Sequence, residues 1–196
     1  ANFAWLQHMI HHLAPNGKIG MVLANGSLSS QSGGEGDIRR KIVEDDLVEG
    51  IIAMPTQLFY TTQIPVSLWF ISRNKTQKGK TLFIDARKMG TMVNRRLREM
   101  TNEDIAKIAS TFKAFDEGAL EDVKGFCAAV KTEAISKQDF ILTPGRYVGI
   151  EEQEDDGEPF KEKMTRLTSE LSQMFKRSHE LEGEIRKRLG AIGYEI

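Results

Sequence analysis

The sequence is poor in the residues that mark several common classes of protein. Among its 196 residues Cys127 is the only cysteine, so no disulfide can form within the chain. One cysteine and four scattered histidines give no zinc-binding pattern, and no apolar run approaches the roughly 20 residues that a membrane-spanning helix needs. The chain starts at Ala1 instead of Met and lacks the features of a signal peptide, which is typical of a cut. We therefore expect a protein of the reducing cytoplasm that has no membrane partner and binds no metal.

An excess of charge of either sign is also missing, because 27 Lys and Arg residues face 28 Asp and Glu residues and the net charge is -1. The whole chain is therefore no electrostatic binder of nucleic acid, and contacts to DNA have to come from a local basic patch. One stretch of a dozen positions holds such a patch, and its basic residues are Arg87, Lys88, Arg95, Arg96 and Arg98. On a loop these side chains can neutralise DNA phosphates, although an ordinary solvated loop has the same composition.

The spacing of apolar residues predicts an α/β fold. Residues 3–13 carry apolar side chains at helical spacing, which predicts an amphipathic helix. Residues 19–23 form a nearly continuous apolar run, which predicts a strand buried on both faces in a parallel sheet. Residues 25–36 are rich in Gly and Ser and predict a mobile loop.

The segments that follow predict the end of this sheet. Asp37 is the expected N-cap of the next helix, and a second buried strand is expected at residues 48–54. Two β-type runs at residues 66–72 and 81–84, separated by a turn-like stretch, predict an antiparallel hairpin. This order is typical of the C-terminal half of a Rossmann-like, doubly wound α/β sheet with an antiparallel end strand, here in residues 1–86. The first half of such a sheet is absent.

The rest of the chain predicts a helical C-terminal region. Residues 87–150 are expected to form a helical and loop extension, with a capping box that opens a helix at Thr101. Residues 151–196 are expected to form an acidic linker and one long helix that starts at Pro159. The apolar residues of this helix recur at the coiled-coil period and are Phe160, Met164, Leu167, Leu171, Met174, Leu181, Ile185 and Leu189. We expect this seam to pack against an external partner, with a helix of the same protein or a second copy as the alternatives.

Two loops are expected to carry the functional site, because open α/β sheets place their sites at the carboxyl ends of parallel strands. The richer loop, residues 55–65, holds Phe59 and Tyr60 beside hydroxyl and amide groups. Aromatic faces of this kind hold bases that are flipped out of DNA, although an aromatic side chain on such a loop can also plug the edge of the sheet. The glycine-rich loop after residue 23 lacks the spacing of a phosphate-binding motif, and we expect it to be a connector.

Several motifs resemble one family in their order and spacing. They are the strand at residues 19–23 with a Pro-Asn-Gly-Lys turn before it and Ala-Asn-Gly after it, the Asp-Ile-Arg-Arg-Lys helix at residues 37–41, and the region from Leu-Phe-Tyr at residues 58–60 to Trp-Phe-Ile at residues 69–71. Together they resemble the gamma-class adenine-N6 DNA methyltransferases, specifically the modification subunits of type I restriction-modification systems. The resemblance continues to Pro-Gly-Arg-Tyr-Val at residues 144–148 and covers most of the chain.

This resemblance implies a site-specific enzyme that transfers a methyl group from S-adenosylmethionine to N6 of an extruded adenine. It implies that Phe59 stacks on the adenine with Tyr60 beside it, and that the C-terminal helix docks on a DNA-specificity subunit, with a restriction subunit as a further candidate partner. The family's Asn-Pro-Pro-Phe/Tyr motif and glycine-rich cofactor motif do not occur in this sequence, so we expect the chain alone to be inactive. The alternative is a non-enzymatic module whose helix recruits a partner.

Overall fold

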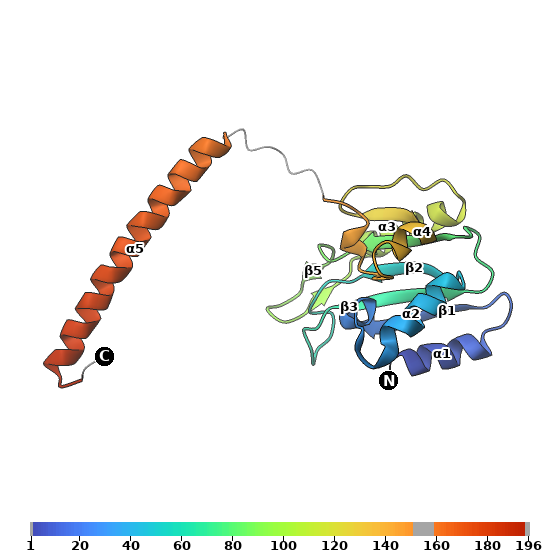
Figure 1. Cartoon of the computed structure of the whole chain (residues 1–196), viewed down its shortest axis with the longest axis horizontal. Helices are drawn as coiled ribbons and strands as arrows, with labels where there is room; N and C mark the ends of the chain where they lie inside the picture. Colours follow the sequence, from blue (N-terminus) through green and yellow to red (C-terminus); the bar gives the residue numbers. More distant parts are fainter. Residues whose placement is uncertain (1, 151–158, 195–196) are drawn as a thin grey trace. The chain divides into compact units, whose positions relative to one another are not determined.

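The structure is a computed structural model that describes residues 2–150 and 159–194. The chain divides into two compact units, Ala1–Glu152 and Gln153–Ile196 (Figure 1). The first unit is a mixed α/β domain of the Rossmann-like type, and the second contains one long helix. The acidic linker expected at residues 151–158 lies outside the described residues. No helix within the described ranges has the length and apolar character needed to cross a membrane.

The α/β domain is built on a five-stranded sheet with the order β1-β3-β2-β4-β7. Its strands are β1 (Lys18–Ala24), β2 (Val48–Ala53), β3 (Val66–Ser72), β4 (Lys80–Asp85) and β7 (Cys127–Lys131). Strands β2 and β4 are parallel, and the other neighbouring pairs are antiparallel. The α/β domain extends beyond residue 86, because β7 lies after that position and pairs with β4.

The predicted hairpin between β3 and β4 is wrong, because these strands lie on opposite sides of β2. The connection between them is held at the turn that precedes β2. There the carboxylate of Asp46 accepts hydrogen bonds from the side chain of Lys75 and from the backbone N–H of Gly79, the latter at 2.9 Å. Lys75 is almost fully buried by this contact. These contacts fix the β3–β4 connection beside the start of β2, so that β4 pairs with β2 on the side opposite to β3.

The expectation that β1 is buried on both faces within a parallel sheet is also wrong. This strand is antiparallel to β3, its sole partner among the described strands, and Ile19 and Leu23 are its buried residues, while Val22 is 53% exposed. An apolar run predicts that a strand forms, but it does not distinguish a central strand from one at the edge of a sheet.

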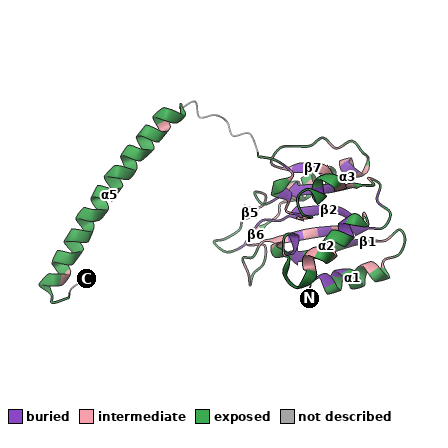
Figure 2. Ribbon diagram, viewed as in Figure 1, coloured by how far each residue is buried: buried purple, intermediate pink, exposed green. Residues whose placement is uncertain are grey.

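Helices cover both faces of the sheet. Helices α1 (Asn2–His12) and α2 (Glu35–Glu44) pack on one face, where the buried Trp69 contacts the ring of Phe3 edge to face at 5.8 Å. Helix α3 (Asn102–Asp116) packs on the other face, where the rings of Phe70 and Phe112 lie 4.9 Å apart. Alternate residues of β3 therefore serve the two cores, and Figure 2 shows the buried residues concentrated in the strands.

The glycine-rich segment after β1 is an ordered structure and not the mobile loop that its composition predicts. It forms two short 3-10 helices, Asn25–Leu28 and Ser32–Gly34. Leu28 is fully buried, and its carbonyl accepts a hydrogen bond from the N–H of Leu142 at 2.9 Å. Helix α2 begins at Glu35 with Gly34 as its N-cap, so Asp37 lies in the first turn and does not cap the helix.

The segment is ordered because Arg39 of helix α2 holds it from within. The side chain of Arg39 is fully buried and donates hydrogen bonds to the carbonyls of Ser30 at 2.7 Å, Ser27 at 3.3 Å and Phe140 at 2.8 Å. Burial lowers the pKa of this guanidinium. The three carbonyls come from two segments about 110 positions apart in the chain, so one side chain joins both to α2.

The elements after β4 complete the domain. The hairpin of β5 (Thr91–Met92) and β6 (Arg98–Glu99) precedes α3, and α4 (Thr132–Ser136) and a 3-10 turn at Pro144–Arg146 follow β7. The ring of Tyr147 stacks on Phe83 at 4.2 Å, its hydroxyl donates to the carbonyl of Ile141, and burial raises its pKa to about 12. Tyr147 thus fastens the end of the domain to the sheet.

Helix α5 (Phe160–Ala191) contains 32 residues, and none of them is buried. Its polar sides carry ion pairs between residues four positions apart, such as Glu182 with Arg186 and Glu184 with Arg188. Seven of its eight seam residues are exposed, with exposed fractions from 42% at Met164 to 79% at Phe160, and Leu189 is half-buried. A helix with this pattern buries its apolar face only by packing against another helix.

Candidate nucleic-acid interface

Three loops meet at one edge of the sheet. Strands β1, β2 and β4 run in the same direction, because β1 and β2 are both antiparallel to β3 and β4 is parallel to β2. Their carboxyl ends therefore lie at the edge where β5 is labelled in Figure 1. The loop after β1 is joined to the loop after β2 by a hydrogen bond from the N–H of Asn25 to the carbonyl of Pro65 at 3.1 Å. This edge is where open α/β sheets bind their ligands.

The loop after β2, residues 55–65, presents the two aromatic residues to solvent. The side chain of Phe59 is 40% exposed and that of Tyr60 is 88% exposed. Leu58 packs against the apolar core beneath the loop, and neither aromatic residue belongs to a core cluster. The loop is therefore anchored by Leu58, which leaves both rings available to a ligand.

Gln57 joins this aromatic loop to the β5–β6 hairpin. Its φ angle is +66°, a left-handed conformation that is uncommon for a residue with a Cβ. Its carbonyl accepts a hydrogen bond from the N–H of Arg98 at 2.8 Å, and its side-chain amide donates to the carbonyl of Arg95 at 3.3 Å. The aromatic loop and the basic hairpin are thus one connected surface, although they are about 35 positions apart in the chain.

The structure brings four of the five predicted basic residues to exposed positions beside this surface. Arg95 and Arg96 are exposed in the hairpin turn, where the side chain of Asn94 accepts a hydrogen bond from the N–H of Arg96 at 2.8 Å. Arg87 and Lys88 are exposed after β4, and the guanidinium Nε of Arg87 donates to the carboxylate of Asp85 at 2.8 Å, which raises the pKa of Arg87.

Arg98, the fifth predicted basic residue, is turned inward. Its guanidinium donates to the carbonyls of Met89 and Gly90, each at 3.0 Å. Its Nε atom is buried and has no hydrogen-bond partner among the described residues. Gly90 has a φ of +80°, and a Cβ at this position would lie 2.9 Å from the carbonyl oxygen of Glu99, so the hairpin requires glycine here.

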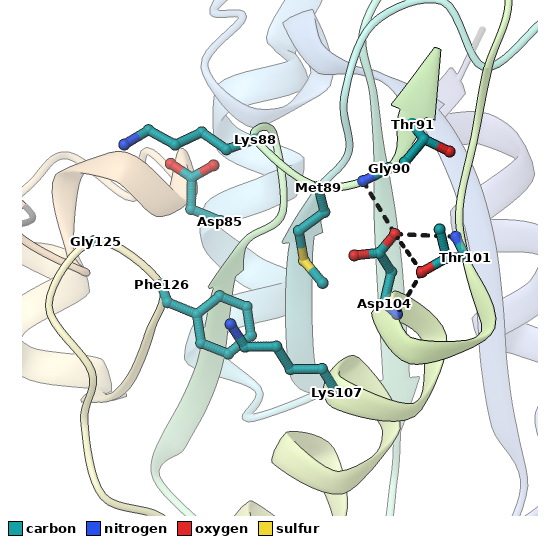
Figure 3. Close-up of a pocket in the computed structure, with 10 residues that line it drawn as sticks. All are labelled: Asp85, Lys88, Met89, Gly90, Thr91, Thr101, Asp104, Lys107, Gly125 and Phe126. Carbon is teal, nitrogen blue, oxygen red and sulfur yellow. Dashed lines mark hydrogen bonds between the residues drawn. The ribbon is translucent and has the colours of Figure 1, made fainter. Parts of the chain in front are cut away.

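A pocket of about 420 Å3 lies between the loop after β4 and the start of α3 (Figure 3). On one side the carboxylate of Asp104 accepts hydrogen bonds from the N–H of Thr101 at 2.9 Å and from the N–H of Gly90 at 3.1 Å. On the other side the ammonium of Lys107 lies 4.2 Å from the centre of the Phe126 ring. The capping box predicted at Thr101 is confirmed, and its acid also holds the hairpin loop.

The hydrogen bonds to Asp104 predict a pH dependence of folding stability. The pKa of Asp104 lies below its ordinary value of 3.8, chiefly because its carboxylate accepts a hydrogen bond from the N–H of Thr101. The charged carboxylate therefore stabilises the folded state above pH 3.8, and this contribution to stability is lost as the pH falls further. We expect the urea midpoint of Asp104→Asn to change less than that of the wild type between pH 5 and pH 3. Glu103→Gln in the same helical turn is the control, and an equal change in all three proteins would contradict this prediction.

A domain with this sheet, and with an aromatic loop and a basic hairpin at the carboxyl edge, belongs to the Rossmann-like class. Residues 1–156 match the family described as N-6 DNA Methylase, and the chain belongs to this family. Over its whole length it is 57% identical to the HindI methylase subunit of a type I restriction enzyme from Haemophilus influenzae, and it covers 44% of that relative. It is 44% identical to the MjaIX methylase subunit from Methanocaldococcus jannaschii, over 99% of this chain and 35% of the relative.

A solved structure shows the same relationship. The methyltransferase subunit of a type I restriction-modification system from Streptococcus thermophilus is 31% identical and superposes with a TM-score of 0.67, over 75% of this chain and 30% of that one. The chain therefore spans less than half the length of these relatives. Its five prolines are isolated from one another, so an Asn-Pro-Pro motif does not occur in it.

Sequence patterns pointed to part of this site and missed the rest. The position of Phe59 after a buried strand and the cluster of basic residues were visible in the sequence. The bonds made by Gln57, Arg98 and Arg39 were not, because they involve backbone carbonyls that leave no pattern in the sequence. Asp104 had a detectable signal, since Thr-x-x-Asp is a capping sequence.

Proposed function

We propose that this chain is the target-base and partner-docking part of a site-specific adenine-N6 DNA methyltransferase, the modification subunit of a type I restriction-modification system. The observation that carries the proposal is the exposed pair Phe59 and Tyr60 on a loop bonded to a basic hairpin, in a chain of the N-6 DNA methylase family. An exposed ring at the carboxyl edge of such a sheet suits the stacking of a flipped base. Basic residues beside it suit the phosphates that flank that base.

In this proposal the residues of the chain bind and orient the DNA. Phe59 stacks on the extruded adenine, and Tyr60 shields its open side. Arg87, Lys88 and Arg95, together with Arg96, neutralise the phosphates on both sides of the base. An Asn-Pro-Pro-Phe/Tyr motif elsewhere in the complete protein accepts hydrogen bonds from the adenine amino group, so the chain alone is inactive.

The glycine-rich segment after β1 does not fit S-adenosylmethionine, which we propose as the methyl donor of the complete protein. Gly33 and Gly34 adopt positive φ angles where the chain enters α2, and Gly34 caps that helix. The side chain of Gln31 occupies the space beside Gly36, where a Cβ would meet its amide oxygen at 1.6 Å. The space beside Gly36 is thus closed by Gln31, and we assign the cofactor site to the rest of the protein.

The sequence of the reading frame upstream of the Ala1 codon tests this proposal. We expect Asn-Pro-Pro-Phe or Asn-Pro-Pro-Tyr within a few tens of residues, preceded by a strand and a glycine-rich turn. A start codon directly before Ala1, with no upstream motif, would contradict the enzyme. It would favour the non-enzymatic module that recruits a partner through α5.

We further propose that the seam of α5 docks on helices of a DNA-specificity subunit, with a restriction subunit as a further candidate member of the complex. Two seam leucines, Leu167 and Leu171, are 43% and 49% exposed. Burying one leucine contributes about 1.5–3 kcal/mol, so we expect Leu167→Glu with Leu171→Glu to raise the Kd for the specificity subunit more than roughly 100-fold. The measurement is titration calorimetry with the purified subunit.

The control for this experiment is Lys176→Glu, which adds a negative charge on the polar side of α5. We expect this variant to bind like the wild type. Equal binding by the double leucine variant would exclude the seam as the docking surface. Loss of a concentration-dependent dimer in the same variant, without an effect on the specificity subunit, would assign the seam to a second copy of the chain.

A further inference from the structure

Arg98 differs from the other basic residues near the aromatic loop in the direction of its side chain. Its guanidinium donates to the carbonyls of Met89 and Gly90 at 3.0 Å, and its Nε atom is buried. Phosphate binding by arginine uses an exposed planar fork with two parallel N–H donors. Both bonds of Arg98 come from its Nη1 atom, so with Nε buried each two-donor edge of the guanidinium has one donor that a phosphate cannot use. Its neighbour Arg96 is exposed.

The bonds of Arg98 belong to a continuous chain of contacts that ends at the aromatic loop. The carboxylate of Asp104 in the capping box of α3 accepts from the N–H of Gly90. The carbonyl of Gly90 accepts from the Arg98 side chain, and the N–H of Arg98 donates to the carbonyl of Gln57 at 2.8 Å. Gln57 lies two residues before Phe59, so this chain of bonds leads from a rigid helix to the proposed base-stacking ring.

Gln57 is the residue that needs this support. A left-handed φ in a residue with a Cβ is strained and persists only where the surrounding structure determines it. The carbonyl and the side-chain amide of Gln57 are both bonded to the hairpin, at Arg98 and Arg95. Without the hairpin in place, the strained peptide would relax and the loop would change its path.

We propose that Arg98 is a positioning residue, which fixes the β5–β6 hairpin so that the hairpin holds the aromatic loop ready for the extruded base, and that Arg98 makes no phosphate contact. This role rests on the proposed function of the aromatic loop. The basic residues near the aromatic loop then have two different roles. Arg96 binds the DNA backbone, and Arg98 sets the geometry of the base pocket.

The first experiment measures the loop without DNA, by hydrogen exchange of the complete methyltransferase. Arg98→Ala is expected to speed amide exchange across residues 58–64 while exchange in β2 and β4 stays at the wild-type rate. Arg96→Ala is the matched control and leaves the loop unchanged. If the loop of Arg98→Ala exchanges like that of the wild type, the positioning role is wrong.

A second variant decides the matter if Arg98→Ala loosens the whole domain. Gln57→Glu keeps the length of the side chain but removes the N–H group that donates to the carbonyl of Arg95. We expect it to speed exchange in the loop alone, to a smaller degree than Arg98→Ala. Unchanged exchange in Gln57→Glu would overturn the proposal.

The second experiment uses the complete methyltransferase with its specificity subunit and DNA that carries 2-aminopurine at the target adenine. Losing one phosphate contact reduces the slope of log K against log salt by roughly 0.9, and we expect this loss in Arg96→Ala. Arg98→Ala is expected to keep the wild-type slope and KM, to reduce the 2-aminopurine signal, and to lower kcat roughly 10- to 100-fold, since a small displacement of a substrate group has effects of this size. Arg98→Lys, which can still donate to one carbonyl, is expected to restore part of kcat.

A reduced salt slope in Arg98→Ala, with full 2-aminopurine signal, would assign Arg98 to the phosphates and overturn the positioning role. The two proposals fail in different ways. If the aromatic loop does not bind the base, the wild-type complex itself gives no 2-aminopurine signal, while hydrogen exchange still reports whether Arg98 holds the loop.

Discussion

The variant Phe59→Ala, in the complete methyltransferase, is expected to lose kcat/KM for DNA by roughly 5- to 150-fold. Stacking of a base on an aromatic side chain contributes about 1–3 kcal/mol, and this range corresponds to that loss. Folding stability should not change, because Phe59 lies outside both core clusters and Leu58 anchors the loop. The measurement is the initial rate of methyl transfer at several DNA concentrations, with the urea midpoint of each variant determined in parallel.

Two further variants make the result specific to stacking. Phe59→Trp keeps an aromatic face and is expected to retain most of the activity. Tyr60→Ala is expected to lose less than Phe59→Ala, because Tyr60 is 88% exposed and only shields the base. Wild-type rates in Phe59→Ala would show that the ring does not take part in base binding.

Arg39→Ala is expected to cause the largest loss of stability, about 3–5 kcal/mol in the free energy of unfolding. The variant leaves the buried carbonyl of Ser27 and the half-buried carbonyls of Ser30 and Phe140 without their donors, and a buried unsatisfied group costs about 1–3 kcal/mol. Part of this cost is recovered as the segments relax or admit water. Urea unfolding followed by circular dichroism gives the value directly.

The neighbouring residue supplies the control. Arg40 is exposed and pairs with Glu44 one turn away, so Arg40→Ala removes the same charge without opening the interior. We expect its urea midpoint to stay near that of the wild type. Arg39→Lys keeps the charge but has one donor group for three carbonyls, and its stability should lie between those of Arg39→Ala and the wild type. A loss below about 1 kcal/mol in Arg39→Ala, the size of an ordinary substitution, would contradict the structural role of this side chain.

The strands of the fold could be predicted where apolar runs were dense. The runs at residues 19–23, 48–54, 66–72 and 81–84 all form strands, since continuous burial leaves a clear signal in the sequence. Strand β7 was missed because Cys-Ala-Ala-Val-Lys contains small residues that occur equally in helices and loops. These runs cannot indicate which strands pair.

The order of the strands depends on contacts that local patterns do not encode. Asp46 holds the connection between β3 and β4, yet in the sequence it is the last of three consecutive acids. Arg39 stands beside Arg40 and Lys41, where the composition predicts a solvated basic surface. One of these three side chains is fully buried, and it orders a segment whose glycine and serine content predicts mobility.

The candidate site was predictable in its location and not in its construction. The sequence alone indicates a loop with two aromatic residues directly after a buried strand. The link from Gln57 to the hairpin depends on a backbone angle and on carbonyl groups, which are the same for every residue type. For this reason the sequence grouped Arg98 with the other candidates for DNA-backbone contacts, while in the structure its guanidinium bonds the carbonyls of Met89 and Gly90.

Methyl transfer by the complete protein is the measurement that tests the central claim most directly. The protein is expressed from its full reading frame with a DNA-specificity subunit and is incubated with methyl-labelled S-adenosylmethionine and duplex DNA, which is then digested to nucleosides. We predict label in N6-methyladenine, and none when the 196-residue chain replaces the complete protein. Label in a methylated cytosine, or no label in any nucleoside although the complex binds DNA, would contradict the assignment.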